Sequence, residues 1–91
     1  SRGLGDVYKR QTFYGLELAY EAGRKGGSLP TVFNAANELA VSQFLNREIK
    51  YLEITEIIED CMKAHKNIEN PTLEQILETE AATYERINSR R

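Results

Sequence analysis

Apolar residues recur every three or four positions along most of the chain, which is the spacing of one face of an α-helix. The clearest stripe consists of Ile54, Ile57, Ile58, Cys61, Met62 and His65. The spacing between these residues alternates between three positions and one, which places them on a single face along about three helical turns. We therefore predict a helix here, with Thr55 as its N-cap.

Two helices are predicted before this stripe. The first follows Gly15 and ends at Gly26-Gly27, since glycine commonly terminates a helix. Its predicted apolar face holds Leu16, Ala19, Tyr20 and Gly23. The second has Ser28 as N-cap and Pro30 in its first turn, where a missing N–H costs nothing, and it ends near Asn46. Its predicted face holds Val32, Phe33, Ala36, Leu39, Ala40 and Phe44.

A fourth helix is predicted at the C-terminal end, after an extended connector at 49–52 and a loop at 67–71. Thr72 and Gln75 have the spacing of a capping box, in which each side chain bonds the other residue's backbone N–H. The predicted apolar face holds Leu73, Ile76, Leu77, Ala81, Tyr84 and Ile87. No alternating strand pattern is present, so we expect an all-α fold, a small four-helix bundle-like domain.

The first eleven residues, SRGLGDVYKRQ, differ from the rest because they hold two glycines and little apolar periodicity. We expect residues 1–11 to be a cloning-derived junction or a disordered leader. The predicted domain is therefore 12–91. Without the leader's three basic residues and one acidic residue, the net charge of −2 becomes −4, from nine basic and thirteen acidic side chains.

Composition excludes several classes of protein. The chain has 91 residues, 41% hydrophobic and 29% charged, which suits one small domain and not a cofactor domain plus a substrate domain. Its charge is too balanced for a nucleic-acid binder, and no apolar run is long enough to cross a membrane. A single cysteine and the lack of a visible secretory signal favour the cytoplasm.

Candidate catalytic residues all have a simpler structural interpretation. His65 has no evident partner, so a structural or helix-terminal histidine is favoured. Cys61 lies within an apolar stripe and is interpreted as a small core residue. The acids Glu56, Glu59 and Asp60 are expected on a solvated outer face, with Lys63 pairing one of the last two. We predict no catalytic, cofactor-binding or metal-binding residue in this chain.

One pattern resists a purely structural interpretation, namely Asn34-Ala35-Ala36-Asn37-Glu38. Asparagine is a poor helix former because its side chain competes for backbone groups. Two asparagines three residues apart therefore suggest a specific contact. Our hypothesis is that Asn34 and Asn37 hydrogen-bond a neighbouring loop or the chain entering the domain, and we take Asn34, Asn37 and Glu38 as a structural motif.

These residues also carry a family resemblance that covers essentially all of residues 12–91. The sequence resembles the C-terminal helical domain of 1-deoxy-D-xylulose-5-phosphate reductoisomerase. The blocks that carry it are LELAYEAG at 16–23, Gly26-Gly27, LPTVFNAANELAV at 29–41, Phe44-Leu45, IKYLEI at 49–54, and LEQILE at 73–78 with Ala81. The NAANE core between a Gly-Gly turn and Phe-Leu is specific to that family.

The resemblance implies a larger enzyme. That family converts 1-deoxy-D-xylulose 5-phosphate to 2-C-methyl-D-erythritol 4-phosphate in the bacterial non-mevalonate isoprenoid pathway, using NADPH and a divalent metal, Mg or Mn. It also implies that the enzyme is a homodimer. In each subunit the NADPH-binding and catalytic domains would be the partners of this C-terminal domain, and neither is contained in the 91 residues. The C-terminal domain braces the catalytic domain and is inactive alone. The alternative is a free-standing helical protein-interaction module, with no nucleic-acid or membrane partner under either hypothesis.

Overall fold

Four helices follow one another along the chain in the computed structural model, which describes residues 2–90 and their side chains from residue 5 onward. They are α1 (Arg2–Lys25), α2 (Leu29–Leu45), α3 (Glu53–Ala64) and α4 (Leu73–Asn88). Ser1 and Arg91, the outer ends of the predicted ranges, lie outside the described residues. The prediction of an all-α, bundle-like fold is confirmed for the described part of the chain.

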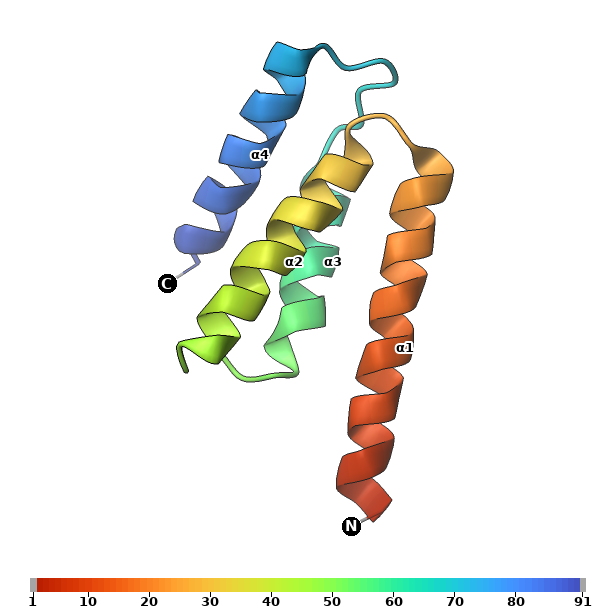
Figure 1. Cartoon of the computed structure of the whole chain (residues 1–91), viewed down its shortest axis with the longest axis vertical. Coiled ribbons are helices and arrows are strands. Elements are labelled where there is room, and N and C mark those ends of the chain that lie inside the picture. The colour runs from red at the N-terminus through yellow and green to blue at the C-terminus, as the bar shows by residue number, and fades with distance from the viewer. Residues whose placement is uncertain (1, 91) are drawn as a thin grey trace.

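The helices run alternately up and down, as Figure 1 shows. α2 and α3 pack together at the centre, with α1 on one side and α4 on the other. α2 contacts all three other helices, whereas α1 and α4 do not touch within the described residues. The N-terminal half of α1 extends beyond the other helices (Figure 1).

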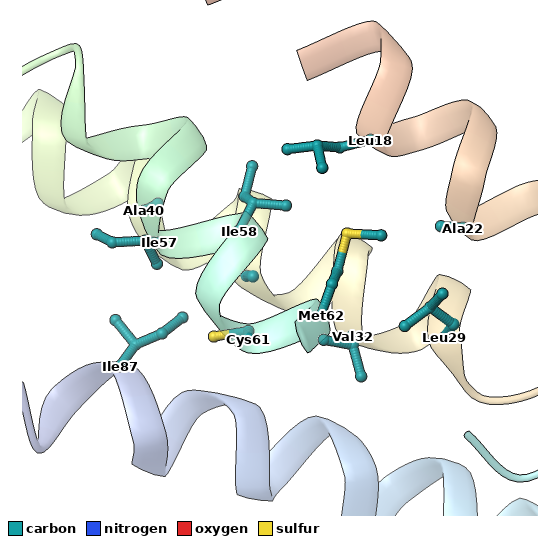
Figure 2. Close-up of a cluster of buried hydrophobic side chains, with 11 residues drawn as sticks. Leu18, Ala22, Leu29, Val32, Ala40, Ile57, Ile58, Cys61, Met62 and Ile87 are labelled. Atoms are coloured by element: carbon teal, nitrogen blue, oxygen red, sulfur yellow. The ribbon is translucent and has the colours of Figure 1, made fainter. Parts of the chain in front are cut away.

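The hydrophobic core lies between α2 and its three neighbours (Figure 2). The predicted stripe of α3 supplies its centre, because Ile57, Ile58, Cys61 and Met62 are all buried. The remaining core residues are Leu18, Ala22, Leu29, Val32, Ala36, Ala40 and Ile87. Ala36 and Ala40 are completely buried, and their small side chains permit close approach of the neighbouring helices.

α1 departs from its prediction in two ways. It begins at Arg2 and runs through Gly15, so residues 2–11 form the first turns of the helix. Glycine costs a helix about 1 kcal/mol at each position, but contacts with α3 and the turn before it offset this cost. Tyr8 packs edge-on against Tyr51 with ring centroids 5.0 Å apart, and Thr55 donates a hydrogen bond to Gln11. That residues 1–11 are a cloning-derived junction or a disordered leader stays a prediction.

The buried face of α1 is also different from the predicted one. Leu18 and Ala22 are buried, whereas Leu16 is 55% and Tyr20 77% exposed. The row that faces the bundle begins with Gln11 and Tyr14, whose polar groups bond to α3. Counting only apolar residues selected the wrong row for this reason.

α4 repeats this pattern. Leu73 and Leu77 are 72% and 56% exposed, while Thr79, Thr83 and Ile87 are buried. The Thr83 hydroxyl donates to the Thr79 carbonyl oxygen at 2.8 Å. Because that bond satisfies the hydroxyl, a threonine can lie in the core, and a scan for apolar residues overlooks it.

The helix ends confirm some predictions and correct others. The Thr72–Gln75 capping box is complete. Thr55, however, is buried inside α3 and is not its N-cap; the helix begins at Glu53, whose carboxylate accepts from the Lys50 N–H at 2.6 Å. The predicted extended connector at 49–52 consists of bends and turns. α2 ends before Asn46 as expected.

The turn after α2 forms a Schellman motif. The Glu48 N–H donates to the Gln43 carbonyl at 2.8 Å, and the Arg47 N–H to the Phe44 carbonyl at 2.9 Å. Arg47 has a positive φ of 61°, a conformation that glycine usually supplies at this position.

Candidate functional site

A cluster of hydrogen bonds around the buried Ser28 joins the α1–α2 turn to the loop between α3 and α4. It consists of Ser28, His65, Asn67 and Ile68, and we call it the serine–histidine joint. Ser28 is completely buried although it lies at a chain turn. The predicted capping by its side chain is wrong: Ser28 occupies the N-cap position of α2 without a side-chain bond to the helix. Asn67 caps from the other loop, since its Oδ1 accepts from the Leu29 N–H at 2.9 Å.

One arrangement of protons satisfies every hydrogen bond of the joint. Ser28 Oγ accepts from the Ile68 N–H at 2.8 Å, donates to Asn67 Oδ1 at 3.1 Å, and lies 2.7 Å from His65 Nε2. A hydroxyl has one hydrogen and two lone pairs. With its hydrogen directed at Asn67, all contacts are satisfied when His65 Nε2–H donates to Oγ. Burial lowers the pKa of His65, which favours the neutral ring.

This serine–histidine pair is therefore structural and not a nucleophile with its base. A nucleophile must be reachable by substrate and must pass its hydrogen to the base, whereas Ser28 is 0% exposed and its hydroxyl donates a hydrogen bond to Asn67 Oδ1. The interpretation of His65 as a structural residue at a helix end is supported by its position as the C-cap of α3. Its partner, Ser28, lies 37 positions away in the sequence and could not be identified from local spacing.

The glycine pair allows the two segments of the joint to meet. Gly26 and Gly27 have positive φ values of 64° and 67°. A Cβ on Gly27 would lie 2.3 Å from the Ile68 carbonyl oxygen, whereas a Cβ on Gly26 would meet nothing within 4 Å. The pair ends α1 as predicted, and Gly27 in addition makes room for the neighbouring loop.

Two of the four acidic residues of α3, Glu59 and Asp60, form ion pairs. Glu59 accepts from the Tyr14 hydroxyl and lies 3.2 Å from Lys63 Nζ, so the predicted Lys63 pairing is confirmed for Glu59. The Tyr14 bond, followed by Lys63, holds the pKa of Glu59 below its usual value. The same bond raises the pKa of Tyr14 to about 12. Glu56 is exposed, in agreement with a solvated face.

Asp60 pairs with α4 instead of with Lys63. Arg86 donates to its two carboxylate oxygens at 3.0 and 3.2 Å, and Arg90 approaches within 3.5 Å. Arg86 is the main cause of the lowered pKa of Asp60. Within the described residues, no group of three or more His, Cys, Asp or Glu side chains is placed to hold a metal ion.

Cys61 is buried in the core as predicted, and burial raises the pKa of its thiol. A buried thiol with a raised pKa has little thiolate and is a poor nucleophile. Its role is packing. None of the helices in the described part of the chain is long and apolar enough to cross a bilayer.

The asparagine motif lies on the surface of α2. Asn34, Asn37 and Glu38 are exposed, whereas Ala35 and Ala36 between them are buried. Glu38 accepts a hydrogen bond from the Tyr84 hydroxyl at 3.3 Å. Neither asparagine side chain bonds another described residue, so the expected bond to a loop is not made within residues 2–90.

Asn37 lines a groove of about 320 Å³ between α1, α2 and α3, which we call the α1–α2 groove. The sequence did not reveal it, because it depends on how three helices meet. A local signal exists in retrospect, since small residues on one side of α1 leave the space open. The lining residues are Gln11, Thr12, Gly15, Leu16, Ala19, Phe33, Asn37, Val41, Tyr51, Ile54, Thr55 and Ile58.

Comparison with known proteins gives consistent matches. Residues 7–86 match the family model described as the DXP reductoisomerase C-terminal domain. A protein of Agathobacter rectalis named 1-deoxy-D-xylulose 5-phosphate reductoisomerase is 57% identical over 79 residues, which are 87% of this chain and 21% of the relative. The proteins of that name from Lachnospira eligens and Clostridium novyi are 55% identical over 80 and 71 residues, 88% and 78% of this chain and 21% and 18% of theirs. The chain thus spans about a fifth of the length of these relatives.

Proposed function

Because the chain belongs to the family of DXP reductoisomerase C-terminal domains, we propose that it is the C-terminal structural domain of a 1-deoxy-D-xylulose 5-phosphate reductoisomerase. The observation that carries the proposal is the match over residues 7–86, together with 57% identity to a protein of that name. The family match favours this function over a free-standing interaction module.

The catalytic work is assigned to the part of the enzyme outside this chain. The groups here that resemble catalytic machinery already have structural tasks: Ser28 and His65 hold two loops together, and Glu59 and Asp60 are paired. The described residues do not fit a metal site. We propose that NADPH and the divalent metal, Mg or Mn, bind the remaining domains of the full-length enzyme, and that this domain braces the catalytic domain beside it.

The full-length enzyme is proposed to be a homodimer in the bacterial cytoplasm. Bacterial relatives of the same name support the bacterial setting, and the homodimer is what the family resemblance implies. The domain's contribution to catalysis is indirect, because it positions the catalytic domain instead of contacting the substrate.

The experiment compares the full-length protein encoded by the parent gene with the 91-residue chain. Consumption of NADPH is followed with 1-deoxy-D-xylulose 5-phosphate and Mg²⁺ or Mn²⁺. The full-length protein is expected to oxidise NADPH only when substrate is present, and the chain alone to show no turnover. A full-length protein without substrate-dependent turnover, or a native reading frame that begins near Phe13, would overturn the proposal.

A further inference from the structure

An unpartnered apolar surface lies on and beside α1. Phe13, Leu16 and Tyr20 are 64%, 55% and 77% exposed, and they recur at steps of three and four residues on the outside of the helix. We call these three residues the outer stripe. Leu16 also lines the α1–α2 groove, so the stripe and the groove form one continuous surface. Adjoining exposed apolar side chains are a common feature of interaction sites.

The groove carries polar groups suited to a polypeptide backbone. Asn37 lines it, and Asn34 is exposed one turn earlier on α2. Each amide offers two donors and an acceptor, and neither is used within the described residues. Side chains three apart on a helix lie about 5–6 Å from each other, close to the roughly 6.6 Å between alternate residues of an extended strand. The pair can therefore bond two alternate peptide groups of an extended segment.

The groove does not suit a lipid surface or a second copy of this chain. Its lining includes no lysine or arginine among the described residues, so it offers no charge for anionic headgroups. A stable symmetric dimer buries about 800 Å² on each partner in a self-complementary patch. A concave groove of about 320 Å³ instead fits one or two inserted side chains.

The position of the groove points to the chain that enters the domain. About four fifths of each relative lies outside the matched region, and in a C-terminal domain that part precedes α1. α1 begins at Arg2, and the first groove residue, Gln11, follows about 14 Å further along the helix. A segment tethered this close has a high effective concentration at the groove.

We propose that the α1–α2 groove is the docking site for an extended segment that precedes α1 in the full-length reductoisomerase. Its backbone bonds Asn34 and Asn37, and an apolar side chain enters the groove beside Leu16 and Phe33. This inference rests on the proposed function, since it requires the longer chain. It gives the asparagine pair the contact that the described residues do not provide.

The first test uses the full-length protein with a photo-crosslinking residue, p-benzoylphenylalanine, replacing Asn37. The matched control places it at Glu78, an exposed residue of α4, a helix that does not touch α1. After irradiation, mass spectrometry is expected to find the crosslinking residue at position 37 joined to a peptide of the same chain from before α1. Crosslinks only to a second copy, or none above the Glu78 level, would overturn the proposal.

A second test measures docking without a bulky probe. Asn34→Ala/Asn37→Ala is compared with Asn46→Ala/Asn70→Ala, which alters two exposed asparagines outside the groove lining. The loss of two hydrogen bonds is expected to speed proteolysis of the segment before α1 about tenfold. Equal rates in both double variants would contradict the docking. Turnover of the unmodified full-length protein is assayed separately, so an active enzyme without the crosslink refutes only the docking, and an inactive one refutes only the function.

Discussion

Gly27 offers the sharpest test of the serine–histidine joint because Gly26 beside it is a natural control. Both residues have nearly the same positive φ, 64° and 67°. Alanine at either position therefore bears the same conformational strain. Only at Gly27 would the new Cβ collide with the neighbouring loop, 2.3 Å from the Ile68 carbonyl oxygen and 2.9 Å from Asn67 Oδ1.

The expected magnitudes follow from the contacts. The conformational strain destabilises each variant by about 1 kcal/mol. An ordinary carbon–oxygen contact is about 3.3 Å, so in Gly27→Ala the loop must retreat by about 1 Å. That movement stretches three hydrogen bonds of 2.8 to 2.9 Å: Ser28 N–H to Ile68, Ile68 N–H to Ser28 Oγ, and Leu29 N–H to Asn67. At about 1 kcal/mol each, Gly27→Ala loses about 4 kcal/mol in total.

The measurement is chemical and thermal unfolding of both variants, followed by circular dichroism. A domain of this size shifts its Tm by about 4–8 °C for each kcal/mol. Gly27→Ala is thus expected to melt at least about 12 °C below Gly26→Ala. Equal losses in the two variants would refute the reasoning, because they would show that the loop does not press on Gly27.

Three further predictions concern single residues. Arg47→Gly is expected to stabilise the domain by about 1 kcal/mol, because glycine adopts the positive φ of this helix end without strain; a lower denaturant midpoint would contradict it. Burial lowers the pKa of His65 from its ordinary 6.5, so the unfolded state binds more protons in that range and stability falls as the pH drops below 6.5. His65→Gln should lose this pH dependence, which urea unfolding at pH values above and below 6.5 measures. If the variant's stability changes with pH as much as that of the unaltered protein, the assignment is wrong. The bond to Glu59 raises the pKa of Tyr14 from 10.0 to about 12, so its stabilising contribution is complete below pH 10 and is lost as the pH rises through about 12. Absorbance titration should show one of the five tyrosines ionising last and Tyr14→Phe lacking that step; simultaneous ionisation of all five would exclude it.

Features defined by neighbouring residues could be predicted from the sequence. The Thr72–Gln75 capping box needs only one helical turn, and both of its bonds form as expected. The buried face of α3 could be identified because its apolar residues all lie on one side of the helix. α1 was misjudged because its inward row includes Gln11 and Tyr14, which are recognisable as bundle-facing only when their bonds to Thr55 and Glu59 are known.

The candidate sites show the same division. The burial of Cys61 followed from the apolar neighbours on its own helix. The partner of His65 did not, because Ser28 belongs to a different turn 37 residues away. The interpretation of the NAANE asparagines as a structural motif stays a prediction, and the position of Asn37 at the groove depends on three helices and not on the motif itself.

The sequence by itself determined that the chain is helical, where most of its helices end, and to which family it belongs, because propensity, capping and motif spacing are properties of adjacent residues. Only the tertiary structure decided which side of α1 and α4 is buried, how the buried polar groups of the joint find partners, and that an open groove remains beside the asparagine pair. These depend on distances between residues far apart in the chain. A helical period shows that a face exists, but the residues packed against that face determine whether it is core or surface.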